Sequence, residues 1–412
     1  MCAGPVHDLK MSSDAGGGTL ERHVPAFVSG LLRQGYSEAG IRSPLQVIRN
    51  FITWISVRQV DFGELNDSSI DLFFRERPRP GHVRRGDLAS LRKFLEYLRE
   101  AGVTPTAPQQ IDESEIGRLK RRFSCWLVEE RGLSETTLSN YLPVVHSFLT
   151  ECFSSGVVEP PDIDVSDITD FVRRQAAATG VRRAQLMTTA LRSFFRFLRS
   201  RGDVITDLSA CVPTVSGRRL TTLPKSLLPK EVESLVQSCD RSTDVGRRDC
   251  AILLILARLG LRAGEIVAME LEHIDWEAGI LTVHGKGGRR DQLPIPHDVG
   301  EAVAAYICDG RPRCTTRRVF IRARAPHRGF AGSAAIDDVV RRALDRAGLD
   351  PPRKGAHLLR HSLATDMLRH GAALTEIGEI LRHSSPGSTE IYAKVDLTAL
   401  TVLAQPWPGG DV

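Results

Sequence analysis

Apolar residues recur at helical spacing through the first two hundred positions, with charged residues between them. In residues 91–99, for example, Leu91, Phe94 and Leu98 lie three or four positions apart and are separated by arginine, lysine and glutamate. This period is typical of amphipathic helices that bury one face. The front half of the chain is therefore predicted to be helical.

The helical pattern of the front half occurs twice. The matching segments are residues 35–38 with 132–135, 69–74 with 167–172, and 91–99 with 191–199. The offset grows only from 97 residues (132 minus 35) to 100 residues (198 minus 98) along the repeat. A nearly constant offset of this kind predicts two diverged copies of one small helical unit.

Beyond position 223 the pattern changes. Pro229 opens a predicted helix, and residues 249–259 are apolar nearly all round, which predicts a buried helix ending at Gly260. Residues 280–284 and 292–296 flank a turn rich in glycine and arginine, as in a β-hairpin. From Ala334 onward the pattern is helical again. The predicted fold class is mainly α with a small antiparallel β-sheet (α+β).

These patterns divide the chain into five predicted segments. A Gly/Ser-rich N-terminus is expected to be disordered, two helical units follow, and a linker leads to a larger domain that carries the candidate chemistry. The segments are residues 1–19, 20–104, 112–205, 206–223 and 224–412. A length of 412 residues agrees with such a multi-domain chain.

Composition excludes several classes of protein. An apolar content of 42% with 25% charged residues is that of a globular protein, and no apolar run is long enough to span a bilayer. The eight cysteines are scattered and form no C-x-x-C pair, which favours reduced, packed thiols. Residues 1–19 lack the apolar core of a signal peptide. We therefore expect a cytoplasmic protein with no membrane contact.

The candidate chemistry lies between residues 262 and 392, where cations and proton donors accompany a tyrosine. A cluster of this kind can surround a phosphate and attack it, because arginine keeps its proton and a phenol can act as a nucleophile. The residues concerned are Arg262, Lys286, His357, Arg360, His383 and Tyr392. Singly, each is more often a surface charge, a turn residue or a packed aromatic, so only the whole set favours a site.

A metal site is a competing interpretation. His357 and His361 are four positions apart, the spacing at which two imidazoles can share a metal on a helix. A zinc hydrolase of that design needs glutamate after the first histidine, where this chain has Leu358, and no third ligand is evident. We therefore expect no metal and no other cofactor.

The ordered motifs identify a family resemblance. Residues 259–265 (LGLRAGE), the Lys286 hairpin, His357-x-x-Arg360-His361 and Leu381-x-His383, with Tyr392 nine residues further on, resemble the signature of the tyrosine recombinases, the phage integrase family. The resemblance covers the chain from about residue 223, and residues 112–205 resemble the family's core-binding domain. The extra N-terminal copy resembles transposon-associated members.

The resemblance implies a role for each matched residue. Tyr392 would be the nucleophile that forms a 3′-phosphotyrosyl link and frees a 5′-hydroxyl. Arg262 and Arg360 would bind the non-bridging oxygens, with Glu265 as the supporting carboxylate, and Lys286 would protonate the leaving oxygen. His357 would assist proton transfer, and His383 would hydrogen-bond the phosphoryl group. Neither ATP nor a metal would be needed.

One position departs from the family pattern. The family usually has glycine before the second histidine, and this chain has Arg382. A side chain is thereby added where the backbone normally turns tightly, although no catalytic group is lost.

Further arginines are candidate contacts to the DNA backbone, because arginine suits bidentate phosphate recognition. They include members of a stretch, residues 311–328, that holds seven arginines and no acidic residue. The predicted DNA-binding residues are Arg121, Arg122, Arg182, Arg183, Arg218, Arg219, Arg289, Arg290, Arg317, Arg318, Arg322 and Arg324.

The resemblance also implies partners. Members of the family act on double-stranded recombination sites as tetramers, and sister recombinases are candidate partners. The apolar segment 397–403 is predicted to dock on a neighbouring subunit. The predicted function is therefore site-specific DNA recombination for integration or transposition of a mobile element. Two alternatives stay open, a relaxing enzyme like the type IB topoisomerases and a non-catalytic DNA-binding partner of other recombinases.

Overall fold

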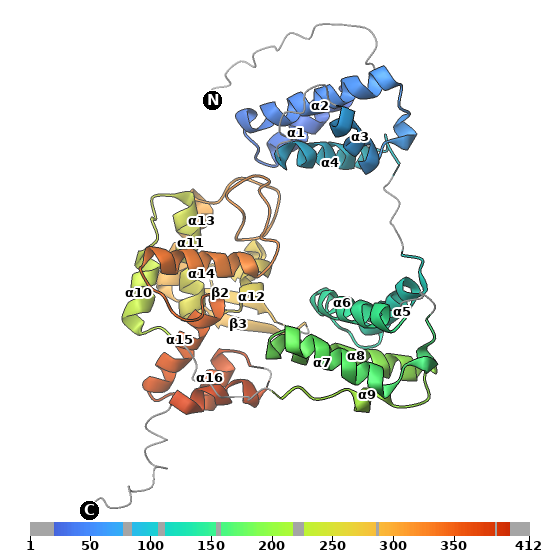
Figure 1. The fold of residues 1–412 in the computed structure, drawn as a ribbon. Coiled ribbons are helices and arrows are strands. Elements are labelled where there is room, and N and C mark those ends of the chain that lie inside the picture. The colour runs from blue at the N-terminus through green and yellow to red at the C-terminus, as the bar shows by residue number, and fades with distance from the viewer. Residues whose placement is uncertain are drawn as a thin grey trace, which may run out of the picture. The chain divides into compact units, whose positions relative to one another are not determined.

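The computed structural model describes residues 20–76, 85–105, 112–153, 158–216, 226–285, 288–383 and 385–395. The chain divides into two compact units, one of residues 1–107 with 222–412 and the other of residues 108–221. Figure 1 shows helices throughout and one small sheet. This mainly helical architecture confirms the predicted fold class.

The first helices form a small bundle with its own core. Ser37 accepts a hydrogen bond from the Gly40 N–H and so caps the longest of them, as expected for serine at a helix start. Phe27, Phe51 and Phe94 are fully buried in the core, which all four helices line. The helices are α1 (Val24–Arg33), α2 (Glu38–Arg58), α3 (Asp67–Glu76) and α4 (Arg85–Glu100).

The unit of residues 108–221 repeats this arrangement of four helices. Its core is rich in aromatic side chains, among them Phe123, Phe148 and Phe194, whose rings pack edge to face with neighbours. The elements are α5 (Glu115–Glu129), α6 (Glu135–Cys152), α7 (Val165–Ala178), α8 (Val181–Arg201) and the short α9 (Leu208–Cys211). Helices therefore occupy matching places in both copies of the repeat read from the sequence.

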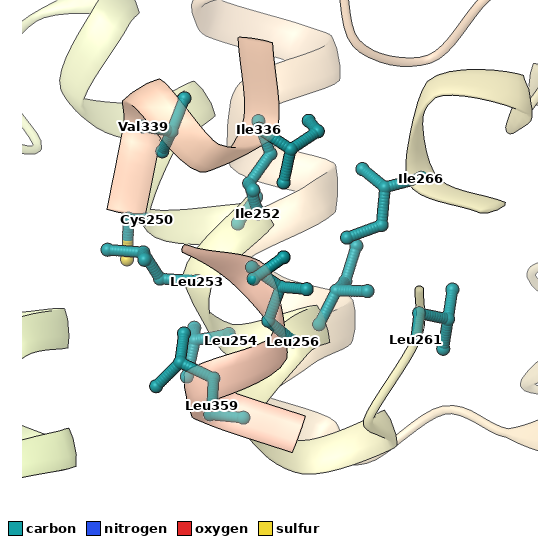
Figure 2. Close-up of a cluster of buried hydrophobic side chains, with 14 of the residues drawn as sticks. Cys250, Ile252, Leu253, Leu254, Leu256, Leu261, Ile266, Ile336, Val339 and Leu359 are labelled. Atoms are coloured by element: carbon teal, nitrogen blue, oxygen red, sulfur yellow. The ribbon is translucent and has the colours of Figure 1, made fainter. Parts of the chain in front are cut away.

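The chain from residue 226 builds a third core. The buried helix predicted at residues 249–259 is α11 (Asp244–Leu254), continued by a π-helical turn at Ile255–Leu259, and Gly260 ends it with φ +58°. Figure 2 shows its aliphatic side chains packed against those of neighbouring helices. The other helices are α10 (Pro229–Gln237), α12 (Ala263–Ala268), α13 (His297–Asp309), α14 (Ala334–Arg346), α15 (Ala356–Arg369) and α16 (Leu374–Ile380).

A three-stranded antiparallel sheet, in the order β1-β2-β3, accompanies these helices. The strands are β1 (Ile274–Asp275), β2 (Ile280–His284) and β3 (Arg290–Pro294), with His284 opposite Arg290. The hairpin confirms the prediction, but its second strand begins two residues earlier than the predicted 292–296. The pairing register sets that start, because each residue of β2 has a partner in β3 as far as Arg290.

Several predicted features lie outside the described residues. They are the disordered N-terminus at residues 1–19, most of the second half of the linker, the apolar segment 397–403, Lys286, Arg218 and Arg219. Within the ranges that are described, none of the helices is long and apolar enough to cross a membrane.

Candidate active site

At one end of the site, Gly260 lies close to the turn at Leu381. Gly260 has φ +58°, a left-handed conformation that favours glycine, and a Cβ atom there would lie 2.7 Å from Leu381 Cδ2, so the Leu381 side chain would have to shift. The two residues that follow lead into α12, with Arg262 at its N-cap. Arg262 is thereby held on the rigid end of a buried helix and beside the turn at Leu381.

Glu265 supports Arg262 from the first turn of α12. Its carboxylate accepts from the Arg262 backbone N–H and from Arg262 Nη1, both at 2.8 Å. Burial alone raises the pKa of Glu265, but the N–H and the guanidinium groups of Arg262 and Arg382 together outweigh it, so that the pKa is lowered. Glu265 is therefore a buried carboxylate that stays ionised and fixes the first arginine.

Arg360 on α15 is 4% exposed and reaches two main-chain carbonyls. Its Nη1 donates to the Gly260 carbonyl and its Nη2 to the Leu381 carbonyl. Burial lowers the pKa of Arg360 to about 10, and the nearby cations Arg262 and Arg382 act in the same direction. The group remains charged at neutral pH, in a region where positive charge is concentrated and an anion would be stabilised.

The turn at residues 381–382 connects both arginines. Arg262 Nη2 donates to the Arg382 carbonyl at 3.0 Å, while the preceding carbonyl, of Leu381, accepts from Arg360. The Arg382 side chain turns inward, is 6% exposed and donates to Glu265 Oε2 at 2.9 Å. Its Nε lies 3.9 Å from Asp291 on β3. Arg382 is thus part of the support of the site.

Arg382 adopts φ +55°, a left-handed conformation that glycine tolerates far better than other residues. This explains why glycine suits this position in the sequence pattern. The side chain is accommodated here because Glu265 provides a buried partner of opposite charge.

His383 follows this turn directly. Its backbone N–H donates to the Gly378 carbonyl at 2.9 Å, and its Nδ1 is 2.7 Å from the hydroxyl of the buried Thr389. Burial, with Arg360 and Arg262 nearby, lowers the pKa of His383 to about 4. A neutral imidazole held at one nitrogen leaves the other nitrogen as a possible hydrogen-bond group for a ligand.

Tyr392 lies in a short 3₁₀ segment, Glu390–Val395, and is 1% exposed. It packs against Ala364, Ile377 and Leu381 from α15, α16 and the turn. Its hydroxyl is 2.8 Å from His361 Nδ1, and the two rings meet edge to face. Burial raises the pKa of Tyr392 to about 12, although Arg360 opposes this effect. The phenol is therefore protonated at neutral pH and needs help to become a nucleophile.

His361 and Thr389 were not among the predicted site residues. His361 was part of the motif that resembles the family and was weighed as a metal ligand, but the sequence assigned it no catalytic role. Nothing in the sequence reveals its contact with a tyrosine 31 residues away. His357, predicted to assist proton transfer, lies one helical turn before His361, with ring centroids 6.2 Å apart. The parts of the chain that the structure describes contain no group of three or more His, Cys, Asp or Glu placed to hold a metal ion.

Lys286 falls outside the described residues, so the structure does not place its ammonium group. The strands on either side of it are described, and they bring Asp291 of β3 towards Arg382. Asp291 pairs with Val283 close to the turn, so the described strands approach Arg382 at the turn end of the hairpin.

The predicted DNA-contacting arginines fall into two groups. Some are exposed and form no ion pair with a carboxylate in the described part of the chain: Arg182, Arg183, Arg290 and Arg324. Arg182 and Arg183 line a cavity of about 480 Å³ between α6, α7 and α8. Others are engaged within the protein: Arg121 with the Asp112 carbonyl, Arg122 with Asp203, Arg289 with Asp291, Arg317 with Glu272, and Arg318 with Glu270 and the Ala268 carbonyl. Arg322, in the arginine-rich stretch 311–328, is partly buried.

Two family models match parts of the chain. Residues 225–398 match the phage integrase family, and residues 121–202 match the phage integrase N-terminal SAM-like domain. An integrase/recombinase of Sinorhizobium fredii, y4rA, is 41% identical over 95% of this chain and 95% of its own length. The tyrosine recombinase XerD of Mycobacterium tuberculosis is 31% identical over 69% of this chain and 94% of its own.

Solved structures show the same fold. The XerH site-specific recombinase, in a post-cleavage complex with a palindromic difH substrate, aligns with a TM-score of 0.55 at 18% identity, over 76% of this chain and 93% of its own. The Tn1549 transposon integrase, in complex with transposon right end DNA, aligns with a TM-score of 0.52 at 14% identity, over 69% and 99%.

Fold and sequence together define this protein as a tyrosine recombinase, an enzyme of site-specific DNA recombination. The chain belongs to the phage integrase family.

Proposed function

We propose that this enzyme cleaves and rejoins DNA strands through a covalent link between Tyr392 and a 3′-phosphate. One observation carries the proposal: the turn at residues 381–382 accepts hydrogen bonds from Arg262 and Arg360, and the same short segment continues to His383 and Tyr392. Phosphate-binding cations and nucleophile therefore belong to a single site.

The residues present fit the needs of such a reaction. A phosphodiester repels nucleophiles because of its charge, and its transition state is stabilised by fixed donors aimed at the developing negative charge. Arg262 and Arg360 provide such donors, and their positions are set by Glu265 and by main-chain carbonyls. His383 would hydrogen-bond the phosphoryl group, and Lys286 would protonate the leaving 5′-oxygen.

The wider assembly follows from the same reaction. Recombination joins two duplexes, so we propose a homo-tetramer on two double-stranded sites, with sister recombinases as possible further subunits. The helical units of residues 20–104 and 112–205 and the catalytic domain of residues 224–412 would each contact the duplex. An integrase/recombinase is among the relatives of this chain, and a transposon integrase bound to transposon right end DNA shares its fold, which supports a role in moving a mobile element.

Covalent capture tests the nucleophile. The probe is a pool of nicked duplexes with a randomised central sequence, in which the short fragment beyond the nick diffuses away after cleavage and prevents rejoining. Wild-type enzyme is expected to form an adduct that survives denaturation. Tyr392→Phe is expected to form none, whereas Tyr141→Phe, a matched change in the core of residues 108–221, should form it normally.

The captured DNA separates the candidate functions. Enrichment of one sequence is expected of a site-specific recombinase. An adduct that persists in Tyr392→Phe would refute the assignment of the nucleophile. Capture without enrichment, together with relaxation of any plasmid, would favour a relaxing enzyme of the type IB kind.

A further inference from the structure

The nucleophile has a direct partner that the family signature leaves without a role. Tyr392 Oη is 2.8 Å from His361 Nδ1, within hydrogen-bonding distance, and the rings pack edge to face at 62°. Among the hydrogen bonds of the described residues, this is the one that the Tyr392 hydroxyl makes. His357, the histidine of the predicted signature, is on the same face of α15 one turn away.

The surroundings of His361 keep it available as a proton acceptor. Burial lowers the pKa of His361 to about 4, and His357, Arg360 and Arg353 contribute in the same direction. His383 also lies within electrostatic range of His361. These neighbours carry positive or no charge, and the neutral imidazole with its proton on Nε2 offers Nδ1 as an acceptor for the phenol.

The tyrosine needs such an acceptor. A buried phenol with a pKa of about 12 has almost no phenolate at neutral pH. Its proton becomes acidic only as the bond to phosphorus forms, so a base already in contact is placed where general-base catalysis requires it.

We propose that His361 is the general base for Tyr392 in strand cleavage and the acid that returns the proton in strand joining. This proposal rests on the proposed function. In cleavage the bond between Tyr392 Oη and phosphorus forms, the bond from phosphorus to the 5′-oxygen breaks, and the phenolic proton moves to His361 Nδ1. The leaving 5′-oxygen takes a proton from Lys286. In joining, each bond and proton returns along the same path.

The negative phosphate makes the transfer easier than in the free enzyme. An anion next to His361 favours the imidazolium form and raises the pKa of the histidine. At the same time, formation of the bond to phosphorus makes the phenolic proton of Tyr392 more acidic. The difference between the pKa values of Tyr392 and His361 is therefore largest before DNA binds, so Tyr392 keeps its proton in the free enzyme.

The test uses full-length enzyme and the duplex enriched by covalent capture, with single-turnover cleavage as the measured rate. His361→Asn places an amide near the position of Nδ1, so it keeps a hydrogen-bonding group but cannot take a proton. A loss of about 10²–10⁴-fold in the cleavage rate is expected, the usual range for a lost general base. His370→Asn, an exposed change at the end of the same helix, is the control and should keep the wild-type rate.

Two further readouts separate proton transfer from positioning. Without a base, cleavage depends on the phenolate fraction, so the His361→Asn rate should rise about tenfold per pH unit between pH 7 and 9, whereas the wild-type rate should stay level. A duplex with sulfur in place of the 5′-bridging oxygen has a leaving group that needs no acid. It should restore cleavage to Lys286→Ala and leave His361→Asn slow.

Each outcome decides the inference. Cleavage by His361→Asn within a few-fold of wild type, or a level pH profile for the variant, would overturn the assignment, while the wild-type adduct would leave Tyr392 as the nucleophile. Restoration of His361→Asn by the sulfur-containing duplex would instead assign His361 to the leaving group. Failure of the wild-type enzyme to form any adduct would refute the proposed function itself.

Discussion

Arg382 allows the cost of a strained backbone to be separated from the value of a buried ion pair. The residue combines φ +55° with a side chain that pairs with Glu265 at 2.9 Å. Arg382→Ala removes the pair and keeps the strain. Arg382→Gly removes both, so the difference between the two variants reports the backbone alone.

The structure sets the expected magnitudes. Breaking a buried pair by removing one partner costs about 3–5 kcal/mol. Glu265 keeps two hydrogen bonds from Arg262 in either variant, so about 3 kcal/mol is expected for Arg382→Ala. A non-glycine residue in the left-handed region costs roughly 1–2 kcal/mol, so Arg382→Gly should be more stable than Arg382→Ala by about 1 kcal/mol.

The measurement must report on the catalytic domain alone, because a chain with several cores does not unfold in one step. Native-state hydrogen exchange of the slowest amides in α11 and α15 gives the free energy of unfolding of that core. The same measurement on Glu265→Gln and on the double variant Glu265→Gln/Arg382→Ala completes a double-mutant cycle.

Two results would refute this reasoning. If Arg382→Ala is as stable as Arg382→Gly, the left-handed backbone carries no cost for a side chain at this turn. If the effects of Glu265→Gln and Arg382→Ala simply add, the two side chains are not coupled in solution, since contacting partners usually show an interaction energy of about 0.5–3 kcal/mol.

Three further predictions concern pH, packing and DNA binding. Burial lowers the pKa values of His361 and His383 from 6.5 to about 4, so the unfolded state binds more protons than the folded state between these pH values. The stability present above pH 6.5 should therefore be lost as the pH falls towards 4. His361→Asn should make this loss smaller, as measured by urea titrations at several pH values. Gly260→Ala should lower the cleavage rate more than it lowers stability, because a Cβ there strains the left-handed backbone whose carbonyl accepts from Arg360 and presses on the Leu381 side chain. Single-turnover cleavage measured beside hydrogen exchange checks this order, and a larger loss of stability than of rate would contradict it. Arg290→Gln should lower the slope of DNA affinity against salt concentration by about one counterion. Arg317→Gln should lower it less, because the Arg317 guanidinium is already paired with Glu272. Equal changes of slope in fluorescence-anisotropy titrations would contradict this distinction.

The fold was largely readable from the sequence because periodicity determines helices and turn chemistry determines hairpins. The buried helix ending at Gly260 and the hairpin around residue 286 were found in this way. The start of the second strand was misplaced, because strand pairing rather than local composition fixes it. The repeat was also visible in the sequence, because the same periodic pattern of apolar residues recurs at a nearly constant offset.

The sequence indicated which residues to consider for the site but not how they contact one another. Motif spacing picked out Arg262, Arg360 and Tyr392, but the partners of each depend on contacts between residues about 30 to 120 positions apart. The contact of His361 with the tyrosine and the inward turn of Arg382 are of this kind. Several arginines predicted to bind DNA, such as Arg122 and Arg317, form surface ion pairs with carboxylates that the sequence pattern does not reveal, and their contact with DNA stays a prediction.

The main-chain carbonyls that hold Arg262 and Arg360 have a consequence for how this enzyme can vary. A carbonyl oxygen is present whatever amino acid occupies the position, so substitution cannot delete these acceptors. A substitution at the turn can therefore change packing and ion pairs, but it leaves these acceptors in place as long as the path of the backbone is kept. An arginine can stand where the family pattern has glycine because the carbonyls that hold Arg262 and Arg360 do not depend on its side chain, and Glu265 provides that side chain with a partner.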